Sequence, residues 1–162
     1  MSTISYGSIT IVDITDVGEF SVYPKCNLPT TVIYSSDPVG YTPNWQSNNL
    51  VITPVAYYAG QPVSTNLTWV WTRKEGTAST GSAVSSTNGE YVSNGSDPIG
   101  GQTYAAGALV VNQNQFAAGT NYSQLTYTVT ATYSDATVGR DLVAEGQITF
   151  SKVQQGASAK IS

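Results

Sequence analysis

One short segment near the C-terminus constrains the fold more than any other feature of this sequence. From Leu125 to Tyr133, apolar or aromatic residues alternate with a threonine at every even position. Successive side chains of a β-strand point to opposite faces of its sheet, so this period of two predicts a strand with one apolar face and one hydroxyl-bearing face. Such a strand suits a two-sheet sandwich, where each sheet buries one face and exposes the other.

The same pattern recurs along the chain and predicts an all-β protein. Residues 67–73 place Leu67, Trp69 and Trp71 on one face and alternate them with Thr68, Val70 and Thr72. Further strands are expected at residues 8–14, 20–23, 30–34, 50–58, 90–92, 108–111 and 141–153. Pro24 and Pro29 cannot donate to a ladder, so the region around them should form short edge strands or an extended arm.

The low number of charged residues restricts the kinds of partner that the protein can bind. Only 10% of the residues are charged, the net charge is −4, and Lys and Arg together number 6. So few cations cannot neutralise several phosphates, which argues against nucleic acid and against an anionic membrane surface as partners. The N-terminus lacks the pattern of a signal peptide, so we expect synthesis in a cytoplasm. Cys26 is the single cysteine and predicts no intrachain disulfide.

Catalytic patterns are missing from the sequence. There is no histidine, the commonest general base, and no Gly-x-Ser-x-Gly motif. Asp135 and Asp141 could meet at the ends of one hairpin, although hairpin ends favour Asp whatever the function. Asp13, Asp16 and Glu19 could form an oxygen-rich calcium cluster, but they do not match the EF-hand spacing. We therefore predict no enzyme activity, no cofactor and no metal site.

Two segments resemble immunoglobulin-like domains: LTWVWTRKEG (residues 67–76) and LTYTVTATY (residues 125–133). The resemblance implies an immunoglobulin-like antiparallel β-sandwich with a core signature of Trp69, Trp71, Tyr127 and Val129. Tyr127 would be the corner tyrosine, and Val129 would stand at the position of the second core cysteine. Because that cysteine is absent, apolar packing alone is expected to hold the two sheets together.

Other short segments of the sequence resemble minor structural proteins of bacteriophage virions. They are ITDVGEFSVYP (residues 14–24), TVIY (31–34), YTPNW (41–45), NLVITP (49–54) and ITFSKVQQGA (148–157). This resemblance implies a non-enzymatic virion protein, of the fibre, tail-tip, collar or head-decoration type, that acts in assembly and surface display. Its expected partners are portal, capsid, tail or fibre subunits and further copies of itself.

The resemblance also implies a division of the chain into three parts. Residues 1–48 would be an N-terminal arm with short strands, residues 49–153 the sandwich, and residues 154–162 a flexible tail. The arm would dock on a neighbour by adding strands; alternatively, its strands belong to the domain's own sheets. The candidate docking residues are Ile9, Ile11, Phe20, Val22, Tyr23, Val32 and Tyr34.

The alternative function is a carbohydrate-binding or adhesion module that attaches to a host-surface glycan. Aromatic rings would stack on sugars, and the polar connection at residues 76–102 has the composition of adaptable binding loops. Within the loop at residues 37–49, Trp45 has a second interpretation as the anchor of that loop. The candidate glycan-binding residues are Tyr41, Trp45, Tyr57, Tyr58, Tyr91 and Tyr104.

Overall fold

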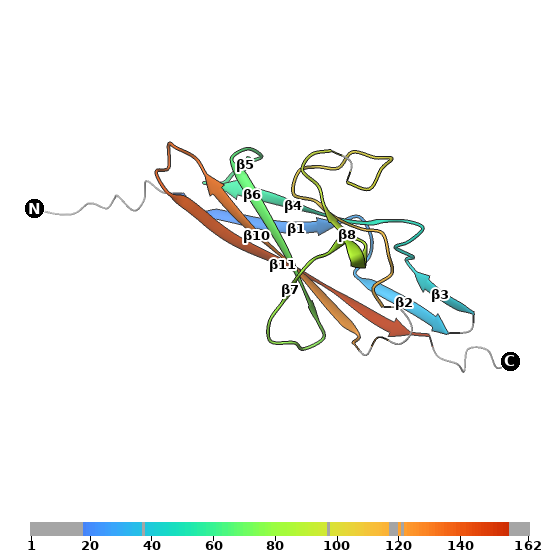
Figure 1. Ribbon diagram of the computed structural model, residues 1–162. Helices are drawn as coiled ribbons and strands as arrows, with labels where there is room; N and C mark the ends of the chain where they lie inside the picture. Colours follow the sequence, from blue (N-terminus) through green and yellow to red (C-terminus); the bar gives the residue numbers. More distant parts are fainter. Residues whose placement is uncertain (1–17, 37, 97, 117–119, 121, 156–162) are drawn as a thin grey trace, which may run out of the picture.

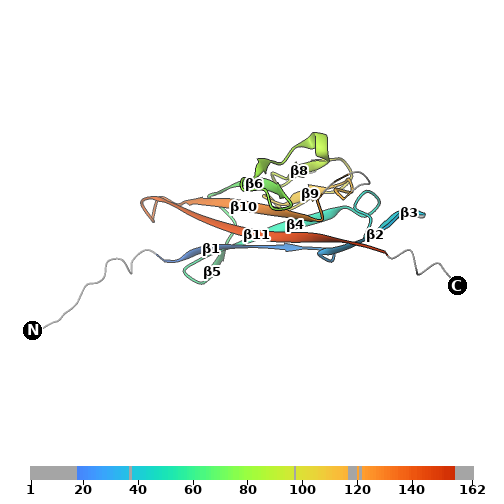
Figure 2. The ribbon, with the colours of Figure 1, turned by 90° about the horizontal axis from the view of Figure 1, so that it is seen from below.

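Two β-sheets pack face to face in the computed structural model, which describes residues 18–36, 38–96, 98–116, 120 and 122–155 (Figures 1 and 2). The prediction of an all-β sandwich is confirmed. The first sheet has the strand order β1-β4-β9-β8, with β5 also paired to β4. Its strands are β1 (Phe20–Cys26), β4 (Leu50–Tyr58), β5 (Gln61–Val63), β8 (Glu90–Val92) and β9 (Leu109–Val111).

The second sheet has the strand order β3-β2-β11-β10-β6-β7. All its pairings are antiparallel except that of β2 with β11, which is parallel. Its strands are β2 (Thr31–Ser36), β3 (Val39–Thr42), β6 (Leu67–Glu75), β7 (Ser82–Ala83), β10 (Gln124–Ser134) and β11 (Asp141–Gln154). A short 3₁₀ turn, η2 (Ser86–Asn88), precedes β8.

The core lies between the sheets and follows the period of two. Leu50 and Ile52 of β4 are buried beneath the first sheet, and Leu125, Tyr127 and Val129 of β10 are buried beneath the second. The threonines of β10 alternate with these residues and occupy the other face of their sheet. The pattern that predicted the strand therefore also predicted its orientation.

Paired prolines mark β1 as an edge strand. Pro24 stands opposite Pro54 in the β1–β4 register. Val51 exchanges hydrogen bonds with Asn27, so the odd-numbered residues of β4 direct their backbone polar groups towards β1. Pro24 and Pro54 therefore form a pair that needs no hydrogen bond between them, and neither missing N–H costs the ladder a bond.

The proposed N-terminal arm requires a correction. β1 pairs with β4 along its whole length, β2 pairs with β11, and β3 pairs with β2, so residues 20–42 belong to the two sheets. Val22 and Val32 of these strands belong to the same core as the rest of the chain, and Phe20 stacks on Tyr133. Tyr34 is buried beside Tyr41, and Tyr23 is exposed. Ile9 and Ile11 lie outside the described residues.

The chain crosses the sandwich from end to end. β1 begins at one end of the molecule and β11 finishes at the other, as both views show (Figures 1 and 2). β11 spans 14 residues and runs along the sandwich (Figure 1). Among the described residues, no helix is long and apolar enough to span a membrane.

Candidate binding site

Two of the six predicted glycan-binding residues are buried. Trp45 is only 1% exposed and packs against Phe116 and Phe150, so its alternative interpretation as a loop anchor is the one observed. Tyr104 is 9% exposed and packs with Ala108 and Val110 on the outside of the first sheet. Neither ring has a free face for a sugar, because each covers apolar surface that would otherwise meet water.

The four other tyrosines do not gather into one surface. Tyr41 lies on β3 against Tyr34 and belongs to the second sheet. Tyr57 and Tyr58 are neighbours on β4 and therefore point to opposite faces, Tyr57 towards Tyr23 and Tyr58 towards Tyr133. Tyr91 lies on β8. No ring contact among the described residues joins any two of the six, and the burial of Trp45 and Tyr104 removes these two rings from the predicted adhesion surface.

A buried Arg–Glu cluster joins the two sheets. It consists of Arg73 on β6, Glu90 on β8, Tyr127 on β10, and Gln115 and Tyr122 in the connection before β10. Arg73 Nη1 donates to Glu90 Oε2 and, at 2.7 Å, to Gln115 Oε1. The Tyr127 hydroxyl donates to Glu90 Oε2 at 2.6 Å. The Ser85 N–H donates to Glu90 Oε1 at 3.1 Å, so both carboxylate oxygens are engaged.

This cluster corrects the expectation that apolar packing alone holds the sheets together. Arg73 is 5% exposed and Glu90 2%, and a charge at such depth is tolerated only when it is paired. The Tyr127 hydroxyl reaches a carboxylate on the facing sheet, not a backbone group as a corner tyrosine would. Burial raises the pKa of Tyr127 well above its usual value, and neighbouring Glu90 raises it further. Because the polar groups of the cluster form hydrogen bonds with one another, the role of the cluster is structural.

Sequence reasoning missed this cluster, although one signal was present. Arg73 follows Trp69 and Trp71 at the same spacing of two, so the alternation itself places Arg73 on the inner face. Glu90 gave no comparable signal, because it lies in the polar connection at residues 76–102, whose composition indicated binding loops.

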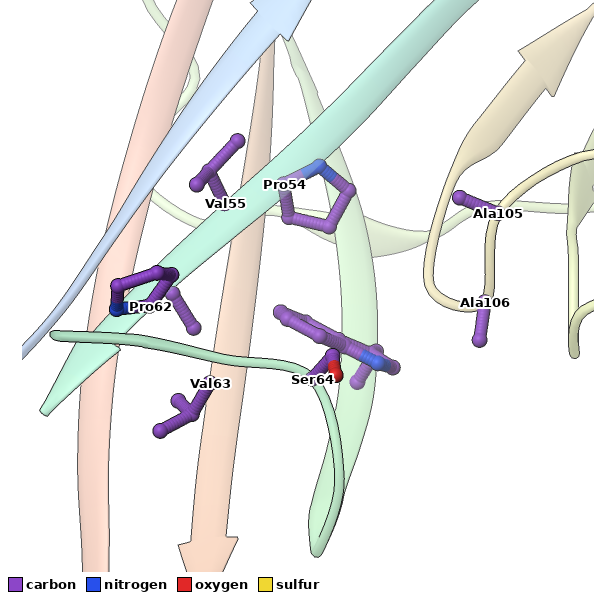
Figure 3. A pocket seen from close by; sticks show the side chains of 9 residues that line it. Pro54, Val55, Pro62, Val63, Ser64, Ala105 and Ala106 are labelled. Carbon is purple, nitrogen blue, oxygen red and sulfur yellow. The ribbon is translucent and has the colours of Figure 1, made fainter.

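A notch of about 440 Å³ opens in the side of the sandwich. Figure 3 shows side chains from β4, β5 and a turn at residues 105–106 converging around it. Trp69 of β6, which is half-buried, contributes its indole from the second sheet. The lining residues are Pro54, Val55, Ala56, Pro62, Val63, Ser64, Trp69, Ala105 and Ala106.

The notch exists because one edge of β4 is only partly paired. β9 pairs with β4 as far as Ile52, and β5 pairs with it from Ala56 onward. Among the described residues, no strand pairs with residues 53–55 of β4 on this side. Pro54 directs its nitrogen towards this gap and has no N–H to satisfy. The missing ladder exposes the indole of Trp69 between the two sheets.

The turn beside the notch is fixed by both tryptophans of β6. Trp71 Nε1 donates to the Gly107 carbonyl at 2.7 Å. Gly107 has φ +87°, and a Cβ at this position would lie 2.6 Å from the Trp69 ring. Only glycine satisfies both the left-handed backbone and the close approach. Trp69 was expected to be a core residue, and it does pack against the core while also lining the notch.

β6 also has an unpaired edge beside the notch. β7 pairs only with Thr72 and Arg73, so within the described residues no strand pairs with residues 67–70 on that side. Asn66 and Gly76 bond to β10, which shows that even-numbered residues direct their backbone groups towards β10. The N–H and C=O groups of Leu67 and Trp69 therefore point to the open edge.

Of the carboxylates predicted as candidates for chemistry, Asp135 and Asp141 form local hydrogen bonds, and Glu19 is exposed at the start of the described residues. Asp135 accepts from the Thr137 N–H and hydroxyl and from the Tyr133 hydroxyl. The backbone bond from Thr137 is the main reason that the pKa of Asp135 is lowered. Asp141 accepts from Ser134. The described residues contain no group of three or more potential metal ligands, and Asp13 and Asp16 lie outside them.

Comparison with known proteins adds no family to these observations. No protein-family model matches the chain, and neither the curated proteins nor the solved structures contain a match. The features that bear on function are therefore the geometry of the sandwich, its notch and its strand edges, and the sequence segments described above.

Proposed function

We propose that the protein is a non-enzymatic structural module of an elongated assembly, and that this assembly is a bacteriophage virion. The path of the chain carries the first part of the proposal. The chain enters the sandwich at the start of β1 and leaves it at the far end of β11 (Figure 1). A module with this geometry can be strung in line with its neighbours without a reversal of the chain.

The chemistry of the described residues supports a binding or assembly role. The buried carboxylate, Glu90, is engaged by Arg73 and Tyr127, and the Asp135–Asp141 hairpin uses its carboxylates for local bonds. Among the open features are the apolar notch and the edge of β6, which suit recognition of another chain. The virion setting rests on the resemblance of five short segments to phage structural proteins, at residues 14–24, 31–34, 41–45, 49–54 and 148–157.

Immunogold electron microscopy tests this proposal. An antibody raised against the chain should label intact particles purified from lysates of cells that carry its gene, at regular positions on the particle. Recovery of the chain only in the particle-free fraction would overturn the proposal. The position of the label, on head, collar, tail tip or fibre, would also identify the neighbouring proteins.

A further inference from the structure

We propose that the notch and the open edge of β6 bind the N-terminal segment of a second copy of this chain, residues 8–14, as an added β-strand. This inference deepens the proposed assembly role, because it names the surface and the segment through which copies join. Three observations carry it: an unprotected strand edge, an apolar notch beside that edge, and a chain segment that matches both.

The edge of β6 lacks the features that keep exposed strands from pairing. Residues 67–70 read Leu-Thr-Trp-Val, with no proline and no charge. Natural sheets commonly blunt their free edges with Lys, Pro or a bulge, so an apolar open edge favours pairing with another strand. Val70 is 59% exposed on the outer face, which leaves an apolar position for a neighbouring strand to cover.

The notch provides room for the side chains that an added strand would bring. A strand beside β6 would direct alternate side chains inward, towards Trp69 and the unpaired segment of β4. The walls at Pro54, Val63 and Ala106 are apolar, and the volume of about 440 Å³ is large enough for two aliphatic side chains. Main-chain bonds to Leu67 and Trp69 would supply affinity, and the notch would supply specificity.

The N-terminal segment has the matching pattern. Ile9 and Ile11 are two residues apart, so a strand over residues 8–14 presents both on one face, and Thr10 and Val12 on the other. Ile9 and Ile11 would enter the notch. Thr10 and Val12 would extend the outer face of β6, where Thr68 and Val70 alternate in the same way.

A second copy is the occupant that fits the position of Gly18. Gly18 N–H donates to the Tyr58 hydroxyl, and Ala59 N–H donates to the Glu19 carbonyl, so the chain reaches β1 along the β1 side of β4. The notch opens on the opposite edge of β4. Gly18 therefore lies on the β1 side of the first sheet, beside Ala59 of the turn between β4 and β5, and closure on the same chain's notch is one of the outcomes that the experiment below distinguishes.

Disulfide trapping between full-length copies tests the proposal. In a Cys26→Ser background, one copy carries Ile11→Cys, and a second copy, tagged to differ in size, carries Ala106→Cys on the rim of the notch. Oxidation of the mixture should give the mixed dimer. The matched control replaces Ala106→Cys with Gln147→Cys, on the exposed outer face of β11, and should lose that product.

Sedimentation of the unmodified chain supplies an independent measurement. The average molecular mass in solution should increase with protein concentration. The Ile9→Asp/Ile11→Asp variant should lose this increase. The control variant Ser2→Asp/Thr3→Asp, which adds the same charge, should retain it. The proposal is overturned by equal trapping at residues 106 and 147, by closure within one chain that carries both cysteines, or by a monomer at every concentration. None of these outcomes affects the labelling of particles, so the two proposals fail separately.

Discussion

At the scale of single residues, the Arg73–Glu90 pair determines how the two sheets are held. Bringing both charges into the interior costs desolvation energy, and their attraction with the added bonds from Tyr127 and Gln115 offsets it. Replacing a whole buried pair by apolar residues is often neutral, whereas removing one partner leaves an uncompensated charge. Substitution of one member of the pair should therefore lower the stability of the fold far more than substitution of both members.

Single replacement of the arginine should destabilise the fold strongly. Arg73→Met leaves the Glu90 carboxylate buried without its cation, and should lower the free energy of unfolding by about 3–5 kcal/mol. The Arg73→Met/Glu90→Gln variant should recover part of this loss. Urea unfolding monitored by tryptophan fluorescence measures both. The adjacent Lys74→Met, on the opposite face of β6, is the matched control and should change stability by less than about 0.5 kcal/mol. Equal losses at residues 73 and 74 would contradict a role for the pair.

Alkaline pH should destabilise the protein through Tyr127. Burial, with Glu90 beside it, raises the pKa of Tyr127 in the folded state above that of an unfolded tyrosine, which is about 10. Above pH 10 the unfolded chain releases this proton while the folded chain keeps it, so stability falls as pH rises, by up to about 1.4 kcal/mol per pH unit. Below pH 10 the contribution is fully present. The slope of urea-derived stability between pH 9 and 11 should be smaller in Tyr127→Phe, and an unchanged slope would contradict this assignment.

The residue scale also shows what sequence alone can predict. The inward position of Arg73 follows from its spacing to Trp69 and Trp71, because alternation is a local property of a strand. Its partner is 17 residues away on the other sheet, and no local pattern relates the two. Trp45 illustrates the same limit, since its burial depends on Phe116 and Phe150, which lie far along the chain.

At the scale of elements, the close approach of β1 to β11 depends on one glycine. A Cβ at Gly146 of β11 would lie 2.7 Å from Pro24 Cδ and 2.8 Å from the Val22 carbonyl oxygen. A glycine within a strand often marks such an approach of another backbone. The missing side chain lets the edge of the first sheet pack directly on the second sheet.

Gly146→Ala should therefore separate these two strands. The added methyl group overlaps backbone atoms that cannot move freely, and we expect a loss of about 1–3 kcal/mol in the free energy of unfolding. Gly40→Ala in β3 is the matched control, because a Cβ there would have no heavy atom within 4 Å. It should be neutral or slightly stabilising, since alanine restricts the unfolded chain. Thermal unfolding of the two variants makes the comparison, and equal melting temperatures would show that the space at residue 146 is not needed.

The elements divide into those that sequence predicts and those that it does not. Strands with several alternating residues, such as β4, β6, β10 and β11, were expected close to their observed bounds. β3, β5 and β7 were missed, because each has at most four residues and forms mainly through its neighbour. The notch was equally hidden, since it results from the gap between β9 and β5 along β4.

At the scale of the whole molecule, the strand directions determine how a pulling force would act. β1 and β11 run in the same direction, and their outer ends lie at opposite ends of the sandwich (Figure 2). A pull on the two ends of the chain draws each strand along its own axis. The seven residue pairs of β1 with β4 and the eleven of β10 with β11 are then loaded together. A module in an extended assembly would benefit from this arrangement.

Single-molecule pulling should show this directional resistance. In a Cys26→Ser background, handles at the two chain termini load β1 and β11 lengthwise. Handles at the N-terminus and at Gln61→Cys instead pull the start of β1 from the end of β4, where Phe20 pairs with Tyr58. The second geometry separates the residue pairs of β1 and β4 one after another, so it should unfold the protein at a clearly lower force. Forced unfolding is governed by the unfolding barrier, not by equilibrium stability, so equal urea midpoints for both proteins provide the control. A lower force for the end-to-end geometry would mean that β1 and β11 are not the strands that bear the load.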